Sequence, residues 1–176
     1  KREVKAFILK FLGWSGDERV LPLLMAHLEQ PDTAEIAAQA LIDFGSGAVP
    51  TILTGLQNEQ DDEIVGLLLR VLNVIGGREA IPRILQFLDH DNPVIRRLAI
   101  ETLGEIPDPA STDYLLAKLD DPDIASQQAA VNSISALVTA FPEMTADVLS
   151  RIRRLLQSPS VPMKLNSLSV YVNIQG

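Results

Sequence analysis

The chain has 176 residues, of which 47% are hydrophobic but only 5% are aromatic, so its core has to be built mainly from Leu, Ile, Val and Ala. This composition favours closely packed helices over β-sheets, because strands favour aromatic and β-branched residues. The net charge of −8 disfavours binding to nucleic acids and to anionic membranes, since both bind through clustered Lys and Arg. The chain has no Cys, which excludes disulfides, thiol nucleophiles and Cys-bound zinc.

Two sequence patterns alternate along the chain. The first is a short amphipathic stretch, here called an A helix, which closes on a Leu at positions 28, 56, 88, 119 and 156. The second is a longer amphipathic stretch, here called a B helix, with an anchor Leu at positions 12, 41, 72, 103 and 137. Successive anchors of the B helices lie 29, 31, 31 and 34 residues apart. Two independent patterns that return at this period predict a stack of helix-pair repeats.

Apolar residues at helical spacing place these helices in chain order, beginning with a B helix. We expect B helices at 2–13, 33–44, 62–75, 93–105, 124–140 and 161–174. We expect A helices at 17–29, 47–57, 78–89, 109–119 and 145–157. Each stretch is long enough for a helix and too long for a typical strand.

Glycines, prolines and short polar residues mark the expected helix ends. Glycines should end two of the B helices, because Gly tolerates a left-handed cap: Gly45, Gly47, Gly76 and Gly77. Prolines lie near the start of three A helices, where a missing N–H costs little: Pro22, Pro50 and Pro82. Side-chain oxygens can cap or lead four B helices: Asp32, Asp61, Asn92 and Asp123.

One repeat resembles a known family closely. It contains an apolar-Pro start, a closing Leu, an Asp-rich turn with Pro, a Val-x-Arg-Arg segment and a closing Leu-Gly: Ile81-Pro82, Leu88, Asp89 to Pro93, Val94 to Arg97, and Leu103-Gly104. This stretch is similar to HEAT-like repeats, most of all to the short type first associated with phycobilisome lyases. The resemblance implies an all-α fold, a right-handed α-solenoid (α-α superhelix) of about five HEAT-like helix pairs plus an extra N-terminal helix. It also implies that B helices line a concave face.

The boundaries of the chain lead to two further expectations. Because the first residues already read as mid-helix, we expect 1–176 to be a single HEAT-like repeat domain cut from a longer array. The lack of Cys is compatible with a reducing compartment, and a cytoplasmic location is expected.

Residues with catalytic or metal-binding chemistry are sparse. The two His residues, His27 and His90, read as helix ends rather than metal ligands. HEAT-like hydroxylases that bind iron carry repeated His-Glu dipeptides, and this chain has none. Gly45-Ser46-Gly47 is too short for a nucleophile elbow. We therefore expect no enzyme activity, no metal and no cofactor.

Charged clusters are expected to be structural. The carboxylates of Asp61 to Glu63 and of Asp120-Asp121 lie in turns before helices, where acidic residues oppose the helix dipole. Asp120 and Asp121 are expected to tolerate charge reversal, which makes them a control for the acids of the B helices. Arg96 and Arg97 are expected on a solvated outer face, paired with acids of a neighbouring repeat.

One polar strip has a candidate function. Positions −9, −2 and +2 from each anchor Leu share one side of a B helix, because a helix turns 100° per residue. They are mostly polar, and acids outnumber bases in the first four repeats. The strip, here called the predicted strip, includes these candidate partner-binding residues: Lys10, Trp14, Gln39, Asp43, Glu63, Arg70, Glu101 and Glu105.

Two interpretations of the predicted strip remain open. It could be an acidic groove for a protein partner with a basic segment, or simply a soluble surface. Trp14 could anchor a partner, or a further repeat could cover it. The preferred function is a non-catalytic protein–protein interaction scaffold. The alternative, from the resemblance alone, is a subunit of a lyase acting on a bilin-type chromophore.

Overall fold

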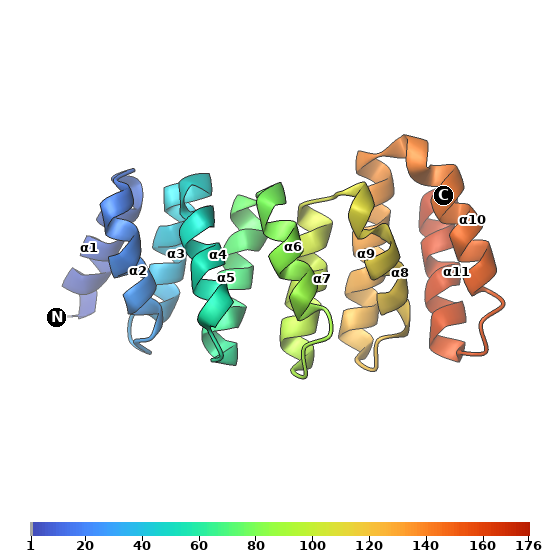
Figure 1. Ribbon diagram of the computed structural model, residues 1–176, viewed down its shortest axis with the longest axis horizontal. Coiled ribbons are helices and arrows are strands. Elements are labelled where there is room, and N and C mark those ends of the chain that lie inside the picture. The colour runs from blue at the N-terminus through green and yellow to red at the C-terminus, as the bar shows by residue number, and fades with distance from the viewer. Residues whose placement is uncertain (1) are drawn as a thin grey trace. The chain divides into compact units, whose positions relative to one another are not determined.

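The computed structural model describes residues 2–176, and in this range the chain forms α-helices and short 3-10 helices without any β-strand (Figure 1). The chain divides into two compact units, one ending at Arg83 and the other beginning at Ile84. Each unit is built from helix pairs of the expected A and B types, so the all-α repeat fold is confirmed. The right-handed sense of the superhelix and the single domain over 1–176 stay predictions.

The first unit contains three B helices and two complete A helices. The B helices are α1 (Arg2–Trp14), α3 (Ala34–Phe44) and α5 (Asp62–Ile75). The A helices are α2 (Leu21–Leu28) and α4 (Val49–Asn58), and the short α6 (Ile81–Ile84) contains the boundary between the units. The B helices pack side by side, α1 on α3 and α3 on α5, while α2 packs on both α3 and α4.

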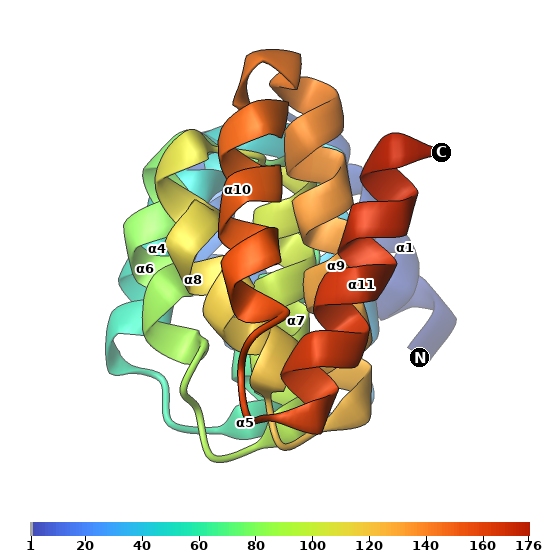
Figure 2. The ribbon, with the colours of Figure 1, turned by 90° about the vertical axis from the view of Figure 1, so that its right-hand side faces the viewer.

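The second unit repeats this arrangement. Its B helices are α7 (Pro93–Glu105), α9 (Ile124–Ala140) and α11 (Val161–Gln175), and its A helices are α8 (Thr112–Ala117) and α10 (Thr145–Leu155). α9 packs between α7 and α11, while α8 packs on α9 and α10 on α11. Figure 2 shows α8 and α10 in one layer and α9 and α11 in the other.

The B helices match the expected ranges closely, but the A helices are composite. Short 3-10 helices precede or follow most of them: Glu18–Val20, Gly45–Ala48, Arg78–Ala80, Leu85–Phe87, Pro109–Ser111, Lys118–Asp120 and Pro142–Met144. A 3-10 turn keeps nearly the same apolar spacing over so few residues, so periodicity cannot separate it from an α-helix.

Three of the four expected side-chain caps are present. Asp61 accepts hydrogen bonds from the backbone of Glu63 and Ile64, Asn92 from Val94, and Asp123 from Ser126. The expectation for Asp32 is wrong. Thr33 occupies the N-cap position of α3, and Asp32 instead lies 3.6 Å from the Lys5 ammonium of α1. Here an ion pair between α1 and the turn before α3 replaces the local cap.

Three of the four expected glycines, Gly45, Gly76 and Gly77, have a positive φ, and two of these end B helices. Gly45 ends α3 with a φ of 81°, and Gly76 ends α5 with a φ of 74°. Gly45 also decides how an apolar stretch folds. Residues Ala34–Asn58 are long and apolar enough to cross a membrane by length and composition, with a mean hydropathy of 1.4. In the structure this stretch is broken at Gly45 into α3 and α4, which both contribute side chains to the core of the first unit.

The anchor leucines form the core, with one exception. Leu41, Leu72, Leu103 and Leu137 are at most 1% exposed. Leu12 is only half-buried, and Leu9 takes its place in the core of α1. The same repeat has a close helix contact, because a Cβ on Gly13 would lie 2.5 Å from the carbonyl oxygen of Ala40.

Candidate functional site

The predicted strip faces solvent along the B helices of both units. Among the eight candidate partner-binding residues, Glu101 is half-buried and the other seven are exposed. Exposure was the basis of the prediction, and the structure agrees with it. Whether these residues bind a partner stays a prediction.

In the first unit the structure brings three strip residues together. The indole Nε1 of Trp14 donates a hydrogen bond to Oδ2 of Asp43 over 3.1 Å, and the amide of Gln39 donates to Oδ1 over 2.9 Å. Both oxygens of the Asp43 carboxylate are therefore engaged. The Trp14 ring nevertheless stays 68% exposed, so its apolar faces are open to solvent.

The other strip residues of the first unit lie apart from this group. Arg70 of α5 donates two hydrogen bonds of 2.7 Å to Glu35 of α3, an acid that the strip did not include. The periodicity of the sequence does not mark Glu35, because it lies 6 residues before the anchor Leu41 and so outside the strip positions. Lys10 and Glu63 form no ion pair within residues 2–176.

The second unit has a groove between α7 and α9. It has a volume of about 420 Å³ and its lining includes Arg97, Glu101 and Glu105 from α7. Small residues make its floor and sides: Gly104, Ala125, Ala129 and Ala136. The opposite wall presents the polar side chains of Gln128, Asn132 and Ser133. Two residues of the predicted strip, Glu101 and Glu105, thus lie on one wall of this groove.

The charge of this groove is modestly negative. Arg97 lies 3.7 Å from Glu101, which partly neutralises that carboxylate. Glu105 is exposed and has no ion-pair partner in the described part of the chain, so it supplies the uncompensated charge. On the facing wall the Gln128 amide donates to Asn132 over 3.1 Å. The sequence placed the two acids on this strip, and Gln128 with them as position −9 from Leu137, but it missed Asn132 and the role of Arg97.

The groove is narrow because α7 and α9 approach closely. A Cβ on Gly104 would lie 2.5 Å from Oγ of Ser133 and 3.0 Å from its Cβ. The Ser133 hydroxyl donates a hydrogen bond of 2.9 Å to the carbonyl of Ile100, which ties the two helices together. Gly104 therefore positions the two walls of the groove.

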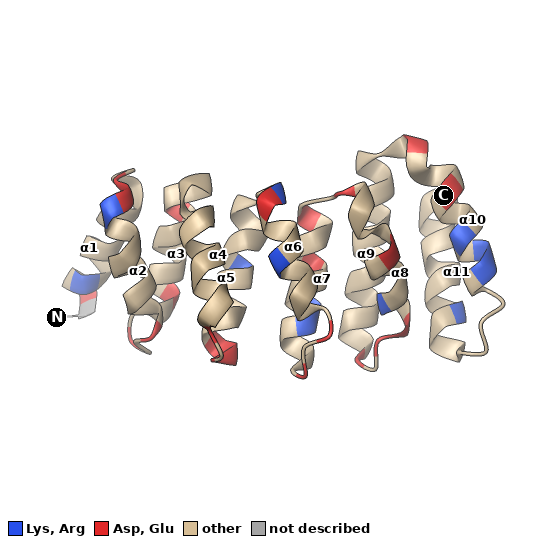
Figure 3. Cartoon of the chain, viewed as in Figure 1, with Lys and Arg blue, Asp and Glu red and all other residues tan. Residues whose placement is uncertain are grey.

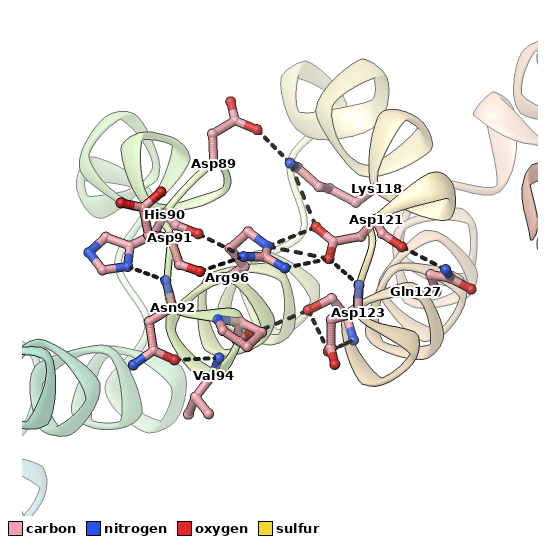
Figure 4. Close-up of polar contacts among 12 residues, drawn as sticks. Asp89, His90, Asp91, Asn92, Val94, Arg96, Lys118, Asp121, Asp123 and Gln127 are labelled. Carbon is pink, nitrogen blue, oxygen red and sulfur yellow. Dashed lines mark hydrogen bonds and ion pairs between the residues drawn. The ribbon is translucent and has the colours of Figure 1, made fainter.

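A buried ion pair joins α7 to the turn before α9 (Figure 4). The Arg96 guanidinium donates to both carboxylate oxygens of Asp121, at 3.0 and 2.9 Å, and to the carbonyls of His90 and Asp91. Hydrogen bonding to Asp121 raises the pKa of Arg96 above its ordinary value. Lys118 adds a bond of 2.6 Å to Asp89. The expectation of a solvated Arg96 is wrong, since it is only 9% exposed, but the pairing between repeats is confirmed.

The two His residues have local structural roles. Nδ1 of His27 lies 3.1 Å from the hydroxyl of Thr33, and Nδ1 of His90 accepts a hydrogen bond from the backbone N–H of Asn92. In residues 2–176 no three His, Asp or Glu side chains gather closely enough to hold a metal ion. Acidic and basic residues are instead spread over many turns and helices (Figure 3).

Comparisons with known proteins agree with this architecture. A family model described as HEAT repeats matches residues 49–135. A search of curated proteins gives no match. Among solved structures, a chain of the CpcE–CpcF complex of phycocyanin lyase from Nostoc sp. PCC7120 is similar, with 23% identity, a TM-score of 0.70, and coverage of 88% of this chain and 99% of that chain.

Two further solved structures share the fold. An engineered protein has 17% identity and a TM-score of 0.57 over 99% of this chain and 92% of its own. A designed armadillo repeat protein has 14% identity and a TM-score of 0.54 over 94% of this chain and 90% of its own. The alternation of A and B helices, the period of the buried leucines and the matched family model lead to one conclusion: this chain has an all-α, HEAT/armadillo-like repeat fold, with HEAT repeats matched over residues 49–135.

Proposed function

We propose that the chain is a non-catalytic scaffold that binds a basic segment of a protein partner in the groove between α7 and α9. The observation that carries this proposal is the groove itself, which combines a floor of small residues with the carboxylates of Glu101 and Glu105 on one wall. Small residues leave space for a partner side chain, and the acids favour a cationic one.

The opposite wall supports a peptide-like partner. Gln128 and Asn132 carry amide groups that can donate and accept hydrogen bonds, as a peptide backbone requires. In the first unit, the exposed ring of Trp14 offers a second contact, since rigid aromatic side chains anchor many protein interfaces. The similar CpcE–CpcF structure is itself a complex of two proteins, which supports protein binding as a use of this fold.

The experiment that tests the proposal reverses the groove charge. The double variant Glu101→Lys and Glu105→Lys changes the charge of the groove by four units. The control double variant, Asp91→Lys and Glu143→Lys, makes the same change in charge at exposed positions outside the groove. Partners recovered by pull-down at low salt are identified for the wild type, and their affinity is then measured for all three proteins. The groove variant should bind about tenfold more weakly or worse, because opposed like charges are costly.

The control pair should bind as the wild type does, and raising the salt should weaken wild-type binding. Asp120 and Asp121, which the sequence suggested as a control, are unsuitable because Asp121 is buried against Arg96. Equal affinity of all three proteins would refute a role for the groove.

A second candidate, a subunit of a bilin-type lyase, is favoured only by the likeness to the phycocyanin lyase complex. A bilin carries two propionates, whereas the groove has one cation in its lining, Arg97, which already pairs with Glu101. Mixing the protein with a free bilin and removing the unbound pigment separates the candidates. A retained, red-shifted absorption band would support the lyase function, and unbound pigment would support the scaffold.

A further inference from the structure

A second groove lies between the A helices α2 and α4 of the first unit, which pack side by side (Figure 1). It has a volume of about 500 Å³. Its apolar lining includes Met25 of α2 and Ile64 and Leu68 of α5. No residue lines both this groove and the one between α7 and α9, so the two are separate surfaces.

Two carboxylates line this groove at the ends of its flanking helices. Glu29 is the C-cap of α2 and Glu59 is the C-cap of α4, so both lie where a helix presents the negative end of its dipole. An acid at this end is unfavourable for the helix, whereas the A helices of the second unit have Lys118, Arg153 and Arg154 there. Helix stability therefore does not account for the two acids.

Neither carboxylate is neutralised by a cation. Glu29 and Glu59 form no ion pair within residues 2–176, and no Lys or Arg lines the groove. One oxygen of Glu59 accepts hydrogen bonds of 2.9 Å from the backbone N–H groups of Gln60 and Asp61, which orients the side chain and leaves its second oxygen available. The last carbonyl groups of α2 and α4 add to the negative potential. This end of the groove therefore attracts a positive charge.

A glycine inside α4 makes room in the groove. A Cβ on Gly55 would lie 2.5 Å from Cε of Met25 and 3.6 Å from Cδ1 of Leu68. Glycine within a helix lowers the stability of that helix, but here it lets the end of the Met25 side chain lie against α4. Because Met is unbranched and flexible, this part of the lining can adjust to an occupant.

The second unit has a matching groove between α8 and α10, with a volume of about 350 Å³. Aligned on the closing Leu of each A helix, Leu116 corresponds to Met25. Met163 and Ile64 correspond as the third residues of α11 and α5. Two Arg and one Asp line this matching groove, whereas the groove of the first unit has acids alone. The repeat fold supplies the shape of both grooves, and the side chains give each its own charge.

A groove of this kind stays open when the row of repeats continues. The lining of each groove comes from its two flanking A helices, the turn after them and the next B helix. The residues that follow α5 do not line the groove of the first unit, and those that precede α8 do not line the groove of the second. Further repeats before α1 or after α11 would therefore leave the groove between α2 and α4 accessible.

We propose that the groove between α2 and α4 binds a Lys or Arg side chain of a protein partner, presented beside an apolar side chain. The aliphatic stem of the cation lies along Met25 and Leu68. Its charged head lies between the carboxylates of Glu29 and Glu59. Lys and Arg suit this groove because each combines a long apolar stem with a terminal charge. A metal ion does not suit it, since two carboxylates are too few ligands and no third metal-binding side chain joins them in the described part of the chain.

The Met residues of the chain make a test specific to this groove. Met25 lines it, Met163 lines the matching groove of the second unit, and Met144 lines neither. NMR spectra of isotope-labelled Met methyl groups report on the three positions separately. The probes are the blocked tripeptides acetyl-Leu-Lys-Leu-amide, acetyl-Leu-Gln-Leu-amide and acetyl-Gly-Lys-Gly-amide. Each is titrated to high millimolar concentration, because so small a ligand binds weakly.

The Leu-Lys-Leu peptide should shift the Met25 resonance in a saturable way and leave those of Met144 and Met163 in place. The other two peptides should bind about fivefold more weakly, because each lacks either the charge or the apolar neighbours that the groove accommodates. Raising the salt concentration should weaken binding of the Leu-Lys-Leu peptide.

A double variant tests the two carboxylates. Glu29→Gln with Glu59→Gln keeps a side-chain oxygen for the local hydrogen bonds and removes both charges, so the Leu-Lys-Leu peptide should bind about fivefold more weakly. The control, Glu18→Gln with Glu79→Gln, makes the same change in charge at exposed positions of the first unit outside the groove. The control should bind the peptide as the wild type does.

Gly55→Ala tests the shape of the groove without changing its charge. The added methyl group would push the end of Met25 into the groove, so the Leu-Lys-Leu peptide should bind more weakly. The melting temperature should stay the same or rise, because Ala has a higher helix propensity than Gly. Weaker binding in a protein that is no less stable separates a loss of the site from a loss of the fold.

Three results would overturn the proposal. The first is a Met25 resonance that does not respond to the Leu-Lys-Leu peptide. The second is an equal response to the Leu-Gln-Leu peptide, which would mean that the groove binds apolar groups regardless of charge. The third is unchanged affinity in the variant that lacks both carboxylates. Charge reversal of Glu101 and Glu105 should leave the Met25 response unchanged, so this proposal and the one for the groove between α7 and α9 fail separately.

Discussion

At the scale of single residues, Arg96 and Asp121 form a deeply buried ion pair in the second unit. The Asp121 side chain is 1% exposed and that of Arg96 is 11% exposed, so water cannot replace either partner. Removing one member of a buried ion pair leaves an uncompensated charge, which typically costs about 3–5 kcal/mol. Asp121→Ala should therefore lower the unfolding free energy by about that amount, as measured by urea denaturation.

The matched control is Asp113→Ala, which removes an ion pair with Arg151 at an exposed site and should change stability little. A double variant, Arg96→Met with Asp121→Ala, should recover part of the loss, because no buried charge is left unpaired. If the Asp121→Ala and Asp113→Ala variants have equal unfolding free energies, the ion pair of Arg96 with Asp121 is less buried than the structure indicates.

The same pair shows where sequence reasoning stops. The Val-x-Arg-Arg segment indicated that an Arg pairs with an acid of the next repeat, but it did not say which Arg or where. Arg96 and Arg97 point to different sides of α7, so one is buried against Asp121 and the other lies in the groove beside Glu101. Burial of a charged side chain is set by the packing of the neighbouring turn, which periodicity does not describe.

At the scale of helices, the anchor leucines define how each repeat packs. The anchors Leu72 and Leu103 are 0% and 1% exposed. Truncating either to Ala should cost about 2–5 kcal/mol in unfolding free energy, because it removes buried methyl groups and leaves a cavity. Val74→Ala and Val94→Ala, at exposed positions of the same two helices, should stay within about 0.5 kcal/mol. Denaturant unfolding of the four variants measures both effects.

Close contacts between B helices make a separate prediction. Gly104→Ala would place a methyl group 2.5 Å from the Ser133 hydroxyl, and Gly13→Ala would place one 2.5 Å from a backbone oxygen of Ala40. Each should destabilise the protein by about 1–3 kcal/mol, as overpacking usually does. Adding Ser133→Ala should relieve part of the cost of Gly104→Ala, whereas no side-chain change can relieve Gly13→Ala. Thermal melts of the three variants measure these losses of stability. If the contacts were looser than the structure indicates, all three variants would lose the same amount of stability.

The helix ranges themselves were largely predictable. The B helices agree with their expected bounds because caps such as Asp61 and Asn92 act locally, within two or three residues of the chain. The composite A helices were not predictable, because a switch between α and 3-10 hydrogen bonding leaves the buried positions of Ile84 and Leu88 almost unchanged. Asp32 failed as a cap because Lys5, on another helix, offered an ion pair instead.

At the scale of the whole molecule, the period of the leucines was sufficient to predict a repeat protein of helix pairs. The solvent-exposed side of the B helices was also predictable, because it follows from helix geometry alone. The groove was not, since its depth depends on Gly104 and Ala129 being small on two helices that are close in space. The ion pair of Arg70 with Glu35 and the bond of Trp14 to Asp43 likewise depend on side-chain conformations across neighbouring repeats.

The close approach at Gly104 has a consequence for how such a protein can lengthen. Aligned on their anchor leucines, Ser133 of α9 corresponds to Ala99 of α7 and to Leu68 of α5. A gene duplication that copied the α7 repeat in tandem would set Gly104 against Ala99, which is smaller than Ser133. A duplication of the α5 repeat would set Asn73, the counterpart of Gly104, against Leu68. Selection would therefore accept a copy of the α7 repeat more readily than a copy of the α5 repeat, because only the α7 copy meets its neighbour through small residues on both helices.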